Sequence, residues 1–263
     1  LDLISEYKEK VLGIKVYEKY GVYFPLLIKF IDANDKLSVQ VHPDDDYAKL
    51  IGEKNGKNEV WYIIDAKKDA KLIYGLKENV SREDFISAIK SNKICETLNE
   101  VYVKPGDCIY IPSGTVHAIM DGILLAEIQQ NSNTTFRIYD WDRYDSHGNK
   151  RELNIDKALD VINFNNKALL KKDYEKVFSK NYTITKLLRS EYFNVDELLI
   201  NDIYKSNTAK DSFMVLLNIN GSGKILWDCK DESINPGDTL LLPAFLGDFE
   251  IKGNMKMLMA YII

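Results

Sequence analysis

The sequence predicts a mainly β protein that consists of two related β-barrel units in tandem, with helical insertions. Short apolar or alternating stretches bounded by turn residues recur along the chain, which is typical of β-sandwiches and barrels. In addition, a Pro-Gly-Asp turn followed five residues later by proline occurs twice, at residues 105–112 and 236–243. Two copies with matched spacing indicate an internal repeat. We therefore expect a first domain at residues 1–165 and a second at 166–263.

Four stretches are predicted as helices from apolar spacing or from acidic residues in the first turn, which the helix dipole favours. They are residues 1–10, 44–50, 81–91 and 154–164. Asn154 is the expected N-cap of the last helix. Because Leu1 already lies within a helical pattern and no methionine precedes it, we expect the natural protein to extend further at its N-terminus.

The predicted strands are short apolar runs or runs that alternate between apolar and polar residues. In the first domain they are residues 24–32, 36–41, 59–66, 70–74, 101–103, 108–112, 123–128 and 136–139. In the second domain they are residues 193–200, 212–218, 223–227, 239–242 and 256–262. The Asn-Gly-Ser-Gly sequence at 220–223 is expected as a turn between two of these strands. We expect Leu240, Leu241, Leu242, Met257 and Leu258 to contribute mostly packing, with one alternating set facing the barrel interior.

Composition excludes several classes of protein. Hydrophobic residues make up 45% and charged residues 29% of the 263, which indicates a folded core rather than disorder. No run reaches 18 apolar residues and no signal-peptide pattern is present, so we expect a cytoplasmic protein that does not cross a membrane. The net charge of −5 without a basic stripe speaks against nucleic-acid binding. Cys95, Cys108 and Cys229 are widely spaced, and we expect buried free thiols.

Polar side chains with metal-binding chemistry lie at the ends of the predicted strands. Gln40 and His42 are two residues apart, so they project from one face of a strand. Glu59 begins the next strand, and His117 follows the turn after Pro112. If the strands form a barrel, two imidazoles, a carboxylate and an amide oxygen converge inside it. That donor set suits one zinc ion, with manganese or iron as alternatives.

The alternative interpretation is that these are separate polar residues at strand ends, which is the commoner situation for a single histidine. The use of four ligand types, including two of only three histidines, favours the metal. The third histidine, His147, lies in a polar loop with glycine and asparagine and is expected to have no ligand role.

Four motifs together resemble the type I mannose-6-phosphate isomerases of the cupin superfamily, in their short bacterial form. They are LSVQVHPDD at residues 37–45, GKNEVWYI at 56–63, PSGTVHA at 112–118 and NSNTTFR at 131–137. The likeness is strong over residues 24–143, and the remainder resembles a degenerate second cupin. The resemblance implies two tandem cupin-type jelly-roll barrels.

The resemblance also implies roles for individual residues. The zinc ligands of the family fall on the four residues chosen above, Gln40, His42, Glu59 and His117. Its active-site lysine falls on Lys57 and its substrate-binding arginine on Arg137. Both cations are expected to contact the phosphate or a developing oxyanion, because they offer only hydrogen-bond donors. Glu127 has the strand position of a base or an orienting carboxylate.

Three departures from the family pattern stand out. Some relatives have a histidine where this chain has Gly56, so no general base is available at that position. A common aspartate of the family is Asn133 here. We expect the tryptophan-rich N-terminal segment of the family to be absent before Leu1, and strands of the first barrel to be missing with it. Residues 151–263 contain no histidine, so the second domain is expected to be metal-free and to serve packing or cleft shape.

The function that the resemblance implies is zinc-dependent interconversion of mannose 6-phosphate and fructose 6-phosphate through an enediol. The chain would then bind a small sugar phosphate as a monomer or homodimer. Two alternatives remain. One is an iron-dependent cupin oxygenase that uses the same histidine and glutamate positions, and the other is a non-catalytic cupin that only binds sugar. Gln40 as a ligand and a lysine near the metal suit a sugar phosphate better than dioxygen.

Overall fold

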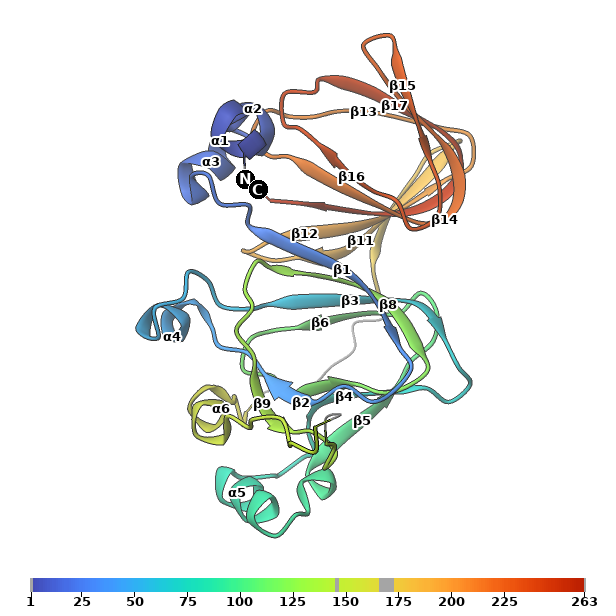
Figure 1. Ribbon diagram of the computed structural model, residues 1–263. Coiled ribbons are helices and arrows are strands. Elements are labelled where there is room, and N and C mark those ends of the chain that lie inside the picture. The colour runs from blue at the N-terminus through green and yellow to red at the C-terminus, as the bar shows by residue number, and fades with distance from the viewer. Residues whose placement is uncertain (1, 145–146, 166–172, 263) are drawn as a thin grey trace. The chain divides into compact units, whose positions relative to one another are not determined.

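The computed structural model describes residues 2–144, 147–165 and 173–262 (Figure 1). Strands contain 44% of the chain and helices 17%, about twice the usual strand content of globular proteins, so the mainly β prediction is confirmed. The chain forms two compact units. The central unit is Leu26–Lys171, and the split unit joins Leu1–Pro25 to Lys172–Ile263.

The central unit is a sandwich of two antiparallel sheets. The four-stranded sheet has the order β1 (Leu26–Ala33), β8 (Ile123–Gln130), β3 (Glu59–Ala66), β6 (Cys108–Ile111). The five-stranded sheet has the order β5 (Leu98–Tyr102), β4 (Lys71–Leu76), β7 (His117–Ile119), β2 (Val39–Val41), β9 (Phe136–Tyr139). Alternation along the strands builds two apolar layers. In β4, for example, Leu72 and Tyr74 pack toward β3 and β8, whereas Ile73 packs into a second cluster.

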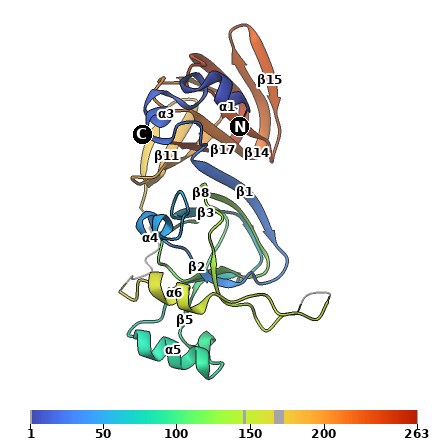
Figure 2. The same ribbon diagram turned by 60° about the vertical axis from the view of Figure 1, so that its left-hand side comes forward.

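Helices cover the outer face of the five-stranded sheet. Phe85 of α5 (Arg82–Lys90) and Ala158 of α6 (Ile155–Val161) are buried in the same cluster as Ile73 (Figures 1 and 2). A short 3-10 helix, η1 (Ile94–Glu96), follows α5. The fourth helix, α4 (Asp45–Leu50), begins after the Asp44 N-cap, whose carboxylate accepts a hydrogen bond from the Tyr47 amide. The starts of these helices agree with the acidic first turns read from the sequence.

Asn154 is the N-cap residue of α6, as predicted, but its side chain makes no capping hydrogen bond. Its Oδ1 instead accepts the backbone N–H of Arg137 at 3.2 Å. The amide thus ties α6 to β9.

The split unit contains one antiparallel sheet. Its strands follow the order β10 (Glu175–Phe178), β11 (Tyr182–Arg189), β12 (Asn194–Ile200), β17 (Asp248–Tyr261), β14 (Met214–Trp227), β15 (Lys230–Ile234). β13 (Ile203–Asn207) also pairs with β17, and β16 (Thr239–Leu242) with β14. The helices α1 (Asp2–Tyr7), α2 (Glu9–Leu12) and α3 (Ile14–Tyr20) belong to this unit. Backbone hydrogen bonds, such as Phe213 N–H to the Leu12 carbonyl, join them to the strands.

The turn predicted at residues 220–223 is wrong, because β14 runs through it without a break. A bulge between Asn218 and Asn220 absorbs the extra residue. Gly221 and Gly223 lie so close to β17 that a Cβ on either would be 2.0 or 2.2 Å from a backbone oxygen of that strand. The glycines therefore serve close strand approach rather than a chain reversal.

The structure also bears on sheet closure, membrane-spanning helices and the cysteines. No described sheet closes on itself, and no described helix is long and apolar enough to cross a membrane. All three cysteines are free, but only Cys108 is buried. Cys95 lies in η1 and Cys229 at the tip of the β14–β15 hairpin, and both are exposed, so the expectation of buried thiols is wrong for these two.

We predict that Leu242→Ala lowers the free energy of unfolding by about 2–5 kcal/mol, because its side chain lies in the core of the split unit. Leu241→Ala is the matched control. Leu242 is 4% and Leu241 43% exposed, which confirms the predicted alternation in β16, whereas Met257 and Leu258 of β17 are both buried and do not alternate. Leu241→Ala should cost less than about 1 kcal/mol. Urea titration of both variants measures the difference, and equal losses would contradict this packing.

Candidate active site and metal centre

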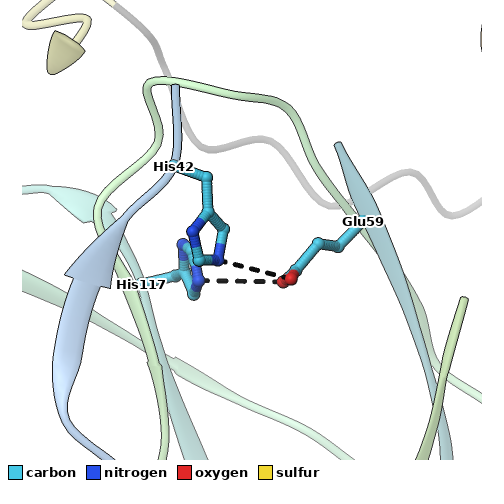
Figure 3. Close-up of side chains that lie close together, drawn as sticks. All are labelled: His42, Glu59 and His117. Carbon is cyan, nitrogen blue, oxygen red and sulfur yellow. Dashed lines mark ion pairs between the residues drawn. The ribbon is translucent and has the colours of Figure 1, made fainter. Parts of the chain in front are cut away.

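Three buried side chains from separate strands meet inside the central unit (Figure 3). His42 follows β2, Glu59 begins β3 and His117 begins β7. Nε2 of His42 lies 3.3 Å from Glu59 Oε1, and Nε2 of His117 lies 3.7 Å from Glu59 Oε2. Their potential ligand atoms all fall within 4.8 Å of one another. The predicted convergence of these three residues is therefore confirmed.

Hydrogen bonds on the far side of each ring orient the two histidines. Nδ1 of His42 lies 3.0 Å from the Thr134 carbonyl, and Nδ1 of His117 lies 2.8 Å from the Thr115 carbonyl. A carbonyl only accepts, so Nδ1 carries the proton in both rings. Each Nε2 then presents a lone pair to Glu59. Hydrogen bonds of this kind fix the tautomer and the ring orientation of histidines that bind a metal.

Burial sets the charge state of the three groups. Loss of hydration lowers the pKa of His42 to about 4 and also lowers the pKa of His117, so both rings are neutral at pH 7. Burial by itself would raise the pKa of Glu59, but the positive charges of His42 and His117, when these rings are protonated, and of Lys57 lower it overall. Glu59 is therefore a carboxylate, and neither of its oxygens has a hydrogen-bond partner among the described residues. An unsatisfied buried carboxylate beside two imidazole lone pairs fits a divalent cation.

Gln40 and Lys57 complete the immediate surroundings of the triad. The Gln40 amide nitrogen lies 3.4 Å from His42 Nε2 and 3.2 Å from His117 Nε2. A half-turn of this amide exchanges Nε2 for Oε1, so the same position can present an oxygen. Lys57 is 5% exposed, and its Nζ lies 3.1 Å from Glu59 Oε1. Lys57 and Glu59, two residues apart, thus lie on one face of the extended segment that leads into β3.

A cavity of about 660 Å³ borders these residues, and Gln40, Lys57, Glu127 and Arg137 are part of its wall. Arg137 donates from Nη1 to the Glu152 carbonyl at 3.0 Å, and its buried Nε has no partner among the described residues. Burial lowers the pKa of its guanidinium, which nevertheless remains charged.

Both oxygens of Glu127 are engaged. Oε1 lies 2.7 Å from Nζ of Lys29, and Oε2 accepts the indole N–H of Trp61 at 2.9 Å. Lys29 was not among the predicted site residues. The available signal was a single cation within an otherwise apolar strand, and its register partner on β8 is Glu127 itself.

Two further arginines in the wall, Arg143 and Arg151, were also missed, because charges in a polar loop resemble ordinary solvated residues. Both approach the buried carboxylate of Asp140, at 2.6 and 3.6 Å. His147 is exposed and lies outside the triad, as expected.

The chain has no room for a side chain at Gly56. A Cβ there would lie 2.4 Å from the backbone carbon of Asp44 and 2.6 Å from the amide nitrogen of Asp45. The loop that follows His42 thus occupies the space that a residue larger than glycine would need.

Comparisons with known proteins identify the family of the chain. The family model described as "Phosphomannose isomerase type I, catalytic domain" matches residues 1–68, and that described as "Mannose-6-phosphate isomerase, cupin domain" matches residues 183–262. The probable mannose-6-phosphate isomerase GmuF of Bacillus subtilis is 41% identical, over 92% of this chain and 76% of its own length. The mannose-6-phosphate isomerase ManA of the same organism is 39% identical, over 92% and 76%.

Solved structures give the same result. The crystal structure of the mannose 6-phosphate isomerase from Bacillus subtilis superposes with a TM-score of 0.89 at 36% identity, and the match covers 98% of this chain and 80% of that one. A putative mannosephosphate isomerase from Archaeoglobus fulgidus, at 21% identity and a TM-score of 0.74, shares the fold. On sequence identity and coverage together, this chain belongs to the mannose-6-phosphate isomerase family of enzymes.

Proposed function

We propose that this protein interconverts mannose 6-phosphate and fructose 6-phosphate in the cytoplasm, with one zinc ion per chain. The observation that carries the proposal is the buried triad of His42, Glu59 and His117. Its neighbours Gln40 and Lys57 line a cavity whose wall carries several cationic side chains. Membership of the mannose-6-phosphate isomerase family supports the choice of substrate.

The residues fit zinc through their chemistry. We assign the ligands as Nε2 of His42 and His117, the Glu59 carboxylate and the amide oxygen of Gln40. Two imidazoles and a carboxylate are a common zinc set, and they leave a position for substrate. A bound divalent ion would polarise the carbonyl and hydroxyl oxygens of the sugar and stabilise the negative charge that develops on them.

The reaction moves a proton between C2 and C1 of the sugar, through an enediol. Lys57 is placed to stabilise the oxyanion, because its ammonium group lies beside Glu59 and the cavity. We assign Glu127 a role in orienting its neighbours rather than that of a base. Both its oxygens already accept hydrogen bonds, from Lys29 and Trp61, so the carboxylate is held in place by the protein.

The arginines of the wall provide a phosphate site. Arg137, Arg143 and Arg151 line one cavity. The only buried carboxylate that Arg143 and Arg151 approach among the described residues is that of Asp140. Cations therefore exceed buried anions at this wall. Guanidinium groups bind phosphate through paired charge-assisted hydrogen bonds, and the unpartnered Nε of Arg137 is one available donor.

We also propose that both units are cupin-type jelly-roll barrels, with the catalytic domain predicted at residues 1–165 and a metal-free second cupin predicted at 166–263. The compact units divide the chain differently at the N-terminus, because Leu1–Pro25 belongs to the split unit, whereas the triad lies in the central unit Leu26–Lys171. The match of the cupin-domain family model to residues 183–262 supports this assignment. So does the position of the only ligand cluster found among the described residues, which lies in the central unit.

Two other functions use the same residues. Two histidines and one carboxylate also bind the iron of non-haem oxygenases, and a cupin without activity could bind sugar alone. The cationic wall and the buried Lys57 beside the triad favour a sugar phosphate over dioxygen chemistry.

The decisive experiment is incubation of the zinc-loaded protein with mannose 6-phosphate. We expect fructose 6-phosphate to form, and the same equilibrium mixture to result from the opposite direction. Oxygen uptake, measured in parallel with the iron-loaded protein, should stay at background. Binding of mannose 6-phosphate without product would leave only a sugar-binding role, and would overturn the proposed activity.

Replacement of His117 by alanine should abolish stoichiometric zinc. Loss of one imidazole leaves too few ligands for a defined site, so we expect the zinc-to-protein ratio to fall from about one to near zero. Elemental analysis after dialysis measures it. His147→Ala removes an exposed histidine and should leave the ratio unchanged. An unaltered ratio in the His117 variant would refute the ligand assignment.

Lys57→Ala and Arg137→Ala should each reduce kcat/KM while zinc is retained, since neither cation can ligate a metal. Loss of a charge-assisted hydrogen bond to a buried anion costs about 1.5–3 kcal/mol, or roughly one to two decades in kcat/KM. Lys49→Ala, which removes an exposed lysine of α4, is the control with expected wild-type kinetics. Wild-type kinetics in both site variants would mean that the substrate binds elsewhere.

A further inference from the structure

The segment that carries Lys57 and Glu59 is held at three consecutive backbone amides. Gly56 N–H donates to Oδ1 of Asp45 at 2.7 Å, and Lys57 N–H to the Pro43 carbonyl at 3.0 Å. Asn58 N–H donates to Oε1 of Gln130 at 2.9 Å. Two of the three acceptors are therefore side chains, and both come from other elements, Asp45 from α4 and Gln130 from β8.

Those acceptor side chains are also bound to each other. Gln130 is 6% exposed, and its Nε2 donates to Oδ1 of Asp45 at 3.0 Å. Its Oε1 accepts a second hydrogen bond, from Nδ2 of Asn58, at 2.7 Å. The backbone N–H of Gln130 also donates to the backbone carbonyl of Asn58 at 3.1 Å. Asp45, Asn58 and Gln130 thus form one connected network, which we call the amide clamp.

The amide clamp reaches the loops of all three triad residues. Asp45 lies three residues after His42, and Asn58 directly precedes Glu59. Oδ1 of Asn58 accepts the backbone N–H of Ser113 at 2.9 Å, in the loop before His117. In that loop the Gly114 N–H donates to the His42 carbonyl at 2.8 Å.

The side chains of the clamp do not line the substrate cavity. Lys57, Gln40, Glu127 and Arg137 do, whereas Asp45, Asn58 and Gln130 are absent from its wall as far as the structure describes it. Successive side chains of an extended segment point to opposite faces, so Asn58 turns away while its neighbour Glu59 enters the site. The clamp can therefore act only through the residues that it holds.

We propose that Asp45, Asn58 and Gln130 are positioning residues of the isomerase, which fix the Gly56–Glu59 backbone so that Lys57 and Glu59 meet the two histidines. The proposal rests on the proposed function for its kinetic consequences, but not for its effect on metal binding. A network that only stabilised the fold would change unfolding without changing zinc affinity.

The first test is Asp45→Ala, with Asp46→Ala as the matched control. Both remove one carboxylate from the first turn of α4, and the N-cap Asp44 remains in both. Asp46 is exposed and pairs only with the exposed Lys49 among the contacts described, whereas Asp45 accepts the Gly56 and Gln130 hydrogen bonds. Zinc affinity is measured by titration of the metal-free protein against a chelator, and kcat and KM are measured on the zinc-loaded enzyme.

We expect Asp45→Ala to weaken zinc binding and to lower kcat, each by about 10- to 100-fold, as for other outer-shell partners of metal ligands. KM should change less, because the phosphate-binding arginines are untouched. Asp46→Ala should match the wild type in all three quantities. Wild-type zinc affinity and kcat in Asp45→Ala would overturn the proposal.

A second variant, Gln130→Met, removes the amide while it keeps the side-chain length. Asn218→Leu, which removes a buried amide from the split unit, is its control for a general loss of stability. We expect reduced zinc affinity only in the Gln130 variant, even if both unfold at lower urea concentration. Equal zinc affinities in the two variants would show that the clamp is only structural. If the wild type binds zinc but isomerises nothing, the proposed function fails, and the zinc titrations still test the clamp.

Discussion

A carboxylate that is buried without a hydrogen bond, that of Glu59, is the constraint on which the central unit depends. A charge in such a place is costly unless other groups compensate for it. The chain supplies Lys57 from the same strand face and two imidazoles from the opposite sheet. The sandwich brings these elements together because His42 and His117 flank neighbouring strands, β2 and β7, whose register pairs Gln40 with His117.

The split unit compensates a buried carboxylate charge in a different way. Its buried acid, Asp196, lies 2.7 Å from Nη1 of Arg189 and accepts the hydroxyl of Tyr261 at 3.2 Å. This carboxylate is compensated by permanent partners of its own unit and has no need of a cation from solution. Burial raises the pKa of Tyr261 to about 12, so the phenol stays a donor at physiological pH. Asp196 is thus ion-paired within its own unit, whereas Glu59 also faces two imidazole lone pairs that could share a divalent cation with it.

Much of this arrangement was predictable from local sequence. β3 and β9 lie where alternation of apolar residues placed them, and the triad followed from residue types at strand ends. Tertiary context decided the rest. β7 has only three residues, too few for a periodic signal. The glycines at 220–223 indicated a turn, because sequence does not reveal that β17 lies directly against them. Lys29 gained its meaning only from its register partner Glu127 on β8.

The contact at Gly56 has a consequence for how the centre moves. Its α-carbon lies against the backbone of Asp44 and Asp45, so the loop after His42 and the segment before Glu59 touch main chain to main chain. No side-chain rotation can relieve such a contact, and the Lys57 N–H bond to the Pro43 carbonyl reinforces it. We therefore expect the two segments to open as one unit in local unfolding, so that His42 and Glu59 leave and re-enter the centre together.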